Sequence, residues 1–142
     1  MRTKLFPHFF HGIIGEAYEQ KGDSQHALAD LQEMVKVEKE SPSRAPWLAS
    51  LAHARAVFGN KKEASRLLAD MTELSRRGDV PSWGFALVYT AMGDKDRAFE
   101  WLDKAYDERP SDLGWIKADP RMDPLRSDPR YRELLLRMGL PQ

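Results

Sequence analysis

The sequence contains no cysteine among its 142 residues. A disulfide framework, a thiolate nucleophile and a cysteine metal site are therefore excluded. The sequence also has no net charge, because 22 lysines and arginines balance 22 aspartates and glutamates. A dedicated nucleic-acid-binding protein carries an excess of basic residues that neutralise phosphates, so direct nucleic-acid binding is not expected. Zero net charge gives little electrostatic repulsion between copies, which leaves a homodimer open.

Long apolar runs are also missing. No run of 18 apolar residues is present, so no membrane span is expected. The N-terminal segment joins two basic residues to an apolar stretch, but Pro7, His8 and His11 interrupt that stretch. We therefore expect no cleaved signal peptide and a cytoplasmic location.

The residue patterns typical of catalytic and metal sites are absent as well. There is no Gly-x-Ser-x-Gly elbow, and the serines lie near expected turns and helix ends, where they cap helices. Asp103 and Asp107 share a helical face among other charged residues, which is typical of a solvated surface. His8 and His11 lie three residues apart without a third metal ligand nearby. We predict no catalytic residue, no metal site and no cofactor; an unrecognised hydrolase would require a nucleophile that the sequence does not reveal.

The pattern that is present indicates paired helices, and residues 82–110 carry it most clearly. Ala86 and Tyr89 lie on one face of an expected helix. Gly93 is expected to end that helix, because glycine adopts the left-handed backbone conformation that other residues resist. Asp94 is then a suitable N-cap for a second helix. A pair of short helices cannot bury its apolar face alone, so such a unit is expected to recur.

The unit recurs in three copies with a period of roughly 34–37 residues. Four columns coincide when the copies are aligned on their turn glycines. They are the glycines Gly22, Gly59 and Gly93; the small residues Gly15, Ala52 and Ala86; the alanines Ala27, Ala64 and Ala98; and the leucines Leu31, Leu68 and Leu102. Small residues are needed where two helix backbones cross closely, so these columns predict the packing face of each pair.

These columns resemble the tetratricopeptide repeat (TPR), whose pattern is W-x2-L-G-x2-Y, then A-x3-F, then P, with a period of about 34 residues. The first copy matches at Ile14-Gly15-x-x-Tyr18 but has His11 where tryptophan usually stands. The middle copy has Arg55 where the tyrosine is expected. The third copy matches at Ala86-x-x-Tyr89 and at Pro110.

The resemblance covers residues 8 to 112 and implies an all-α fold. We predict a right-handed helical-repeat solenoid of three TPR-like helix pairs plus a C-terminal capping helix, in a single domain over residues 1–142. The expected repeats are about 8–41, 45–78 and 79–112, followed by a capping segment, 113–142. Outside the third pair, the expected helices are 7–20, 24–39, 47–58, 61–76 and 129–138, with a loop at 40–46 and short turns at Asp119-Pro120 and Asp123-Pro124.

The resemblance also implies a function. In this family the first helix of each pair lines a concave groove that holds a peptide or a partner protein. The residues on these helices away from the packing columns are Phe9, Glu16, Glu19, Gln20, Ser50, His53, Val57, Trp83, Leu87 and Thr90. One end of this surface is acidic and the other is apolar. For Trp83 and Leu87, packing against the capping segment or a neighbouring domain is the alternative.

Some members of the family grip a C-terminal carboxylate with lysines and asparagines on these first helices. The corresponding positions here are Gly12, Glu16, Ala49, His53, Trp83 and Leu87. No such clamp can form in this groove, so an acidic tail is not its expected ligand.

We therefore expect a non-catalytic scaffold for protein association. The C-terminal segment also resembles the end of such repeats in bacterial multidomain regulators, and the abrupt entry into the first repeat indicates a piece of a longer protein. The alternative function is a self-association or intramolecular packing module of such a bacterial transcriptional or signalling regulator.

Overall fold

A computed structural model describes residues 7–39, 44–77, 80–108 and 110–140. The described residues form helices, turns and loops without a β-strand, which confirms the all-α prediction. None of the described helices is both long enough and apolar enough to cross a bilayer. By its internal contacts the chain divides into two compact units, residues 1–80 and 81–142, which we call the first and second unit.

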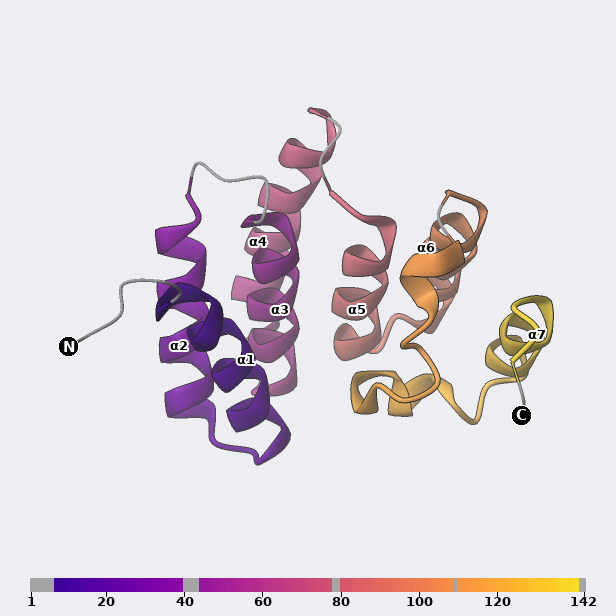
Figure 1. The fold of residues 1–142 in the computed structure, drawn as a ribbon, viewed down its shortest axis with the longest axis horizontal. Coiled ribbons are helices and arrows are strands. Elements are labelled where there is room, and N and C mark those ends of the chain that lie inside the picture. The colour runs from indigo at the N-terminus through magenta and orange to yellow at the C-terminus, as the bar shows by residue number, and fades with distance from the viewer. Residues whose placement is uncertain (1–6, 40–43, 78–79, 109, 141–142) are drawn as a thin grey trace. The chain divides into compact units, whose positions relative to one another are not determined.

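The described part of the first unit is built from α-helices that pack in sequence. They are α1 (Pro7–Gln20), α2 (Ser24–Val37), α3 (Arg44–Val57) and α4 (Lys61–Ser75). Helix α1 packs against α2, α2 against α3, and α3 against α4 (Figure 1). Neighbouring antiparallel helices of this length are expected to share a buried stripe of apolar residues.

The small-residue column lies in that stripe, as the sequence predicts. Gly15 is buried, and Ala52 has no exposed surface. A Cβ atom on Gly15 would lie 2.8 Å from Cγ of Leu31, so α1 and α2 approach each other there more closely than larger side chains would allow. Gly22 and Gly59 end α1 and α3 with φ of 77° and 91°, so they adopt the left-handed conformation that the sequence predicts for Gly93.

Helix α3 begins three residues earlier than predicted. The sequence-based boundary is residue 47, whereas the helix begins at Arg44. The expected loop includes Pro46 because two prolines and two serines within seven residues indicate a break between helices. Pro46 falls in the first turn of α3, however, where a backbone N–H has no helical acceptor and proline is tolerated. Residues 40–43 of the expected loop lie outside the described residues.

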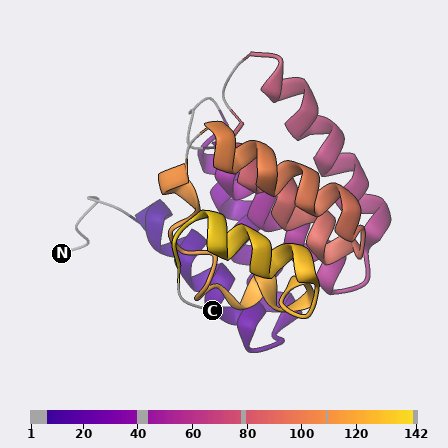
Figure 2. The same ribbon diagram turned by 90° about the vertical axis from the view of Figure 1, so that its right-hand side faces the viewer.

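The second unit continues with a third helix pair and the C-terminal segment. Its elements are α5 (Ser82–Met92), α6 (Lys95–Glu108), the 3₁₀ helices η1 (Pro110–Leu113) and η2 (Pro120–Leu125), and α7 (Pro129–Arg137). Helix α5 packs against α6 and η2, and α6 against η1 and α7. Figure 2 shows α7 running beside α6. Leu102, Ile116, Met122 and Leu134 are fully buried members of one apolar cluster that joins these elements.

The two expected turns before α7 form a single 3₁₀ helix instead. Asp119 accepts a hydrogen bond from the backbone N–H of Arg121 at 2.9 Å, which caps η2. Side chains three residues apart share one face of a 3₁₀ helix, and Met122 and Leu125 are both fully buried on it. Burial of these two side chains favours a continuous element, and Pro124 is accommodated within it.

Candidate functional site

Two polar contacts join α1 and α3, the first helices of the two pairs in the first unit. The hydroxyl of Ser50 donates a hydrogen bond to Oε1 of Glu16 at 2.7 Å. Three residues further along both helices, Nδ1 of His53 contacts Oε1 of Glu19. Steps of three residues keep both contacts on one face of each helix. The fold therefore brings four of the predicted groove residues together, and we call these four side chains the polar ladder.

The Glu19–His53 contact is removed from water. The side chains of His53 and Glu19 are 5% and 2% exposed. Oε2 of Glu19 is buried and has no hydrogen-bond partner among the described residues, and the close contact between Nδ1 of His53 and Oε1 of Glu19 does not have the geometry of a hydrogen bond. Burial of a carboxylate is costly unless another group compensates for its charge. The imidazole of His53 is the group that lies close enough to compensate the charge of the Glu19 carboxylate.

The polar ladder does not have the geometry of an activated serine. A serine nucleophile needs a neighbouring base that takes up its proton, most often a histidine. The hydroxyl of Ser50 donates to the carboxylate of Glu16 instead, and Ser50 itself is 2% exposed. This arrangement links two helices and offers no open surface beside the hydroxyl.

Two predicted groove residues of the first unit lie on its surface. Gln20 is exposed, and Val57 is 50% exposed. They occupy equivalent places, two residues before the turn glycines that end α1 and α3. The side chain of Phe9 lies outside the described part of the chain.

On α5 the three predicted groove residues have different surroundings. Leu87 is fully buried in the apolar cluster of the second unit. Thr90 is 3% exposed, and its hydroxyl donates to the backbone carbonyl of Ala86 at 2.7 Å. Trp83 is half-buried, and its ring meets that of Trp115 edge to face at 5.7 Å. Trp83 thus contacts the C-terminal segment, and Leu87 belongs to a cluster that includes residues of that segment; this is the packing alternative that the sequence left open.

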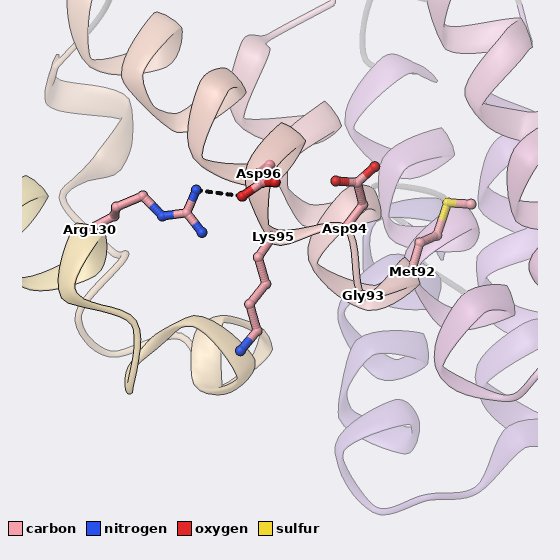
Figure 3. A pocket seen from close by; sticks show the side chains of 6 residues that line it. All are labelled: Met92, Gly93, Asp94, Lys95, Asp96 and Arg130. Atoms are coloured by element: carbon pink, nitrogen blue, oxygen red, sulfur yellow. Dashed lines mark hydrogen bonds and ion pairs between the residues drawn. The ribbon is translucent and has the colours of Figure 1, made fainter.

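An open pocket in the second unit surrounds the turn between α5 and α6 (Figure 3). Nη1 of Arg130 donates to Oδ1 of Asp96 at 2.7 Å across this pocket. Asp94 accepts from the backbone N–H of Arg97 at 3.2 Å, which confirms its predicted role as the N-cap of α6. Figure 3 shows Lys95 extending away from the Arg130–Asp96 pair. Both acidic side chains are engaged by neighbours, and the Arg130–Asp96 pair links α7 to α6.

Asp128 begins α7 in the same interaction network. It accepts hydrogen bonds from the backbone N–H of Arg130 at 3.0 Å and from Nη2 of the same residue at 2.9 Å. These hydrogen bonds lower the pKa of the Asp128 carboxyl to about 2. The Arg130 guanidinium also lies 4.5 Å from the ring centre of Phe99 on α6. The C-terminal helix is therefore held by charged groups as well as by its apolar face.

A second pocket, which the sequence did not predict, lies between α2, α3 and α4 in the first unit. Its volume is about 290 Å³. The side chains come from one stripe of each helix, at steps of three or four residues. We call it the basic pocket, and its lining residues are Gln32, Val35, Lys36, Lys39, Arg44, Leu48, Leu51, Arg55, Glu63, Arg66, Leu67 and Asp70. The signal that could have revealed it is basic residues on facing stripes of successive helices.

Among the described residues, no group of three histidine, aspartate or glutamate side chains is placed to hold a metal ion. Nδ1 of His26 lies 2.8 Å from Oδ2 of Asp23 at the start of α2. The side chains of His8 and His11 lie outside the described part of the chain. No described constellation points to a cofactor.

Comparison with known protein families identifies a repeat in the second unit. The family model of the tetratricopeptide repeat matches residues 83–112, which cover α5, α6 and the start of the C-terminal segment. No curated protein and no solved structure matches the chain. Residues 83–112 are therefore identified as a tetratricopeptide repeat, and such a repeat suggests a protein–protein interaction module.

Proposed function

We propose that this chain is a non-catalytic scaffold that holds a segment of a partner protein along the surface of α1 and α3. The observation that carries the proposal is the tetratricopeptide repeat at residues 83–112, because stacked repeats of this kind present extended binding surfaces. The pairs α1–α2 and α3–α4 have the same buried small-residue column and the same turn glycines, which supports their being further repeats. The right-handed solenoid and its concave groove remain predictions.

Within this surface, Glu16, Gln20 and Val57 are the side chains that a partner would contact directly. Gln20 and Val57 are exposed, and Glu16 is half-buried. The buried members of the polar ladder would instead fix the spacing of α1 and α3. A surface that offers a carboxylate on α1 and an exposed valine on α3 suits a partner segment that carries both a basic and an apolar side chain.

On α5 the proposed contribution comes from Trp83. Its half-exposed ring is braced by Trp115, and rigid aromatic side chains are common anchors of protein interfaces. Leu87 and Thr90 are buried, so they would meet a partner only if α5 opened locally.

The alternative is a self-association or intramolecular packing module of a larger bacterial transcriptional or signalling regulator. A specific observation favours it: Ile13 and Ile14, adjacent on α1, are 47% and 43% exposed. Neighbouring exposed apolar side chains often mark a surface that another protein chain covers.

Site-specific photo-crosslinking separates these functions. A photoreactive amino acid is placed at Gln20, Val57 or Ala69, and each protein is irradiated in extract of the source cells. Ala69 is an exposed residue of α4 and provides the matched control. We expect Gln20 and Val57 to yield the same crosslinked partner, identified by mass spectrometry, and Ala69 to yield none.

Three other outcomes are informative. A product of twice the chain mass from the α1 and α3 positions would support self-association and contradict the peptide-binding scaffold. Equal crosslinking at all three positions would indicate non-specific contact and would also contradict it. No product at Gln20 or Val57 would reject the surface of α1 and α3 as the binding site.

A further inference from the structure

We propose that the basic pocket between α2, α3 and α4 binds an acidic segment of another protein. This pocket uses the second helices of both pairs together with one stripe of α3, so it does not include the proposed α1–α3 surface. The two proposals can therefore fail independently.

The charges that line the pocket are predominantly positive. Five basic side chains face two acidic ones. Both acidic side chains lie next to the same arginine: Nε of Arg66 donates to Oε1 of Glu63 at 3.0 Å, and Nη1 of Arg66 lies 3.8 Å from Oδ2 of Asp70. The Arg66 guanidinium holds the pKa of the Glu63 carboxyl below its usual value. Glu63 also lies within electrostatic reach of Arg55. The two carboxylates therefore cannot neutralise all five basic side chains, and the lining keeps an excess of positive charge.

Two of these basic groups already have hydrogen-bond donors withdrawn from water. The Nε atoms of Arg44 and Arg55 are buried and have no hydrogen-bond partner among the described residues. A buried donor without an acceptor is costly, and a carboxylate is the acceptor that best fits a guanidinium group. Because both Nε atoms are closed off from solvent, a ligand carboxylate would satisfy them only if the two arginine side chains turned toward it.

The positions of these arginines are unusual for purely structural residues. Arg55 stands where the other two copies of the repeat carry Tyr18 and Tyr89. Arg44 is the first residue of α3, where the helix dipole disfavours a positive side chain. An anion bound in the pocket would make both the arginine at position 55 and the positive charge at the start of α3 favourable.

The base of the pocket indicates a peptide rather than an isolated ion. Leu48, Leu51 and Leu67 are at most 5% exposed and form an apolar base beneath the charged rim. The volume of about 290 Å³ is several times the roughly 30 Å³ that one water molecule occupies in the liquid. An apolar side chain on the base, flanked by carboxylates at the rim, would fill the pocket and neutralise it.

The test is a fluorescence-anisotropy titration of the full chain with labelled probes. The first probe is a nine-residue peptide with a central leucine between runs of glutamate. The second has glutamine in place of every glutamate, and the third is a single-stranded oligonucleotide of nine nucleotides. We expect the acidic peptide to bind, with an affinity that falls as salt rises, and the glutamine peptide to show no binding.

Charge-matched variants then locate the site. Arg44→Gln with Arg55→Gln removes two pocket charges, whereas Lys61→Gln with Lys62→Gln removes two exposed charges from the same unit outside the pocket. We expect the arginine pair to weaken binding by about tenfold or more and the lysine pair to weaken it by less than about twofold. If the arginine variant does not fold, Lys36→Gln with Lys39→Gln replaces it, since both of these lysines are exposed.

The proposal is overturned by any of three results. One is an acidic peptide that does not bind at low salt. Another is equal weakening by pocket and control variants, which would mean that the attraction is not localised. The third is tighter binding of the oligonucleotide than of the peptide, which would assign the pocket to nucleic-acid phosphates.

Discussion

Replacing His53 with alanine is expected to lower the free energy of unfolding by about 3–5 kcal/mol. The substitution removes the group that contacts Glu19 and leaves a 2% exposed carboxylate without compensation. Oε2 of that carboxylate already lacks a partner among the described residues, so the loss of His53 leaves it more isolated. Urea unfolding followed by far-ultraviolet circular dichroism measures the change.

His26 provides the matched control. Its ring also lies beside a carboxylate, that of Asp23, but the two side chains are 60% and 37% exposed. His26→Ala is expected to cost at most about 1 kcal/mol, because water screens exposed pairs. In a double-mutant cycle, Glu19→Ala combined with His53→Ala should cost less than the sum of the two single substitutions. Equal losses for His53→Ala and His26→Ala would contradict the role of the buried contact.

Leu31→Ala is expected to destabilise the chain by about 2–5 kcal/mol. Leu31 is fully buried, and its Cγ lies opposite Gly15 where α1 and α2 come closest. Truncation there removes apolar contacts and leaves a cavity, because glycine on the facing helix has no side chain that could fill it.

Leu68→Ala tests the same column in the next helix pair. Leu68 is only half-buried, while its neighbour Leu67 is 4% exposed. We expect Leu68→Ala to cost clearly less than Leu31→Ala in chemical unfolding. The reverse order would mean that burial does not govern the contribution of these leucines.

The features that the sequence predicted correctly depend on short-range chemistry. Asp94 caps α6 through the backbone N–H of Arg97, three residues away, so this cap can be inferred from a few neighbouring residues. The turn glycines follow from backbone sterics alone.

The features that the sequence did not predict depend on which helices face each other. Periodicity placed Ser50 and His53 on an open groove, but contacts with α1 bury both of them. Such pairs join residues 34 positions apart, and no local pattern specifies them. The basic pocket needs stripes from three helices at once, and in the sequence its basic residues resemble an ordinary solvated surface.

Small side chains in register allow these helices to pair, and the proposed binding surfaces depend on this pairing. Urea unfolding of two variants, Ala52→Leu and Ala69→Leu, tests this dependence on small side chains. Ala52 has no exposed surface, whereas Ala69 is exposed on α4. We expect Ala52→Leu to lower the free energy of unfolding by about 1–3 kcal/mol and Ala69→Leu to leave it almost unchanged. Equal stability of the two variants would contradict this dependence.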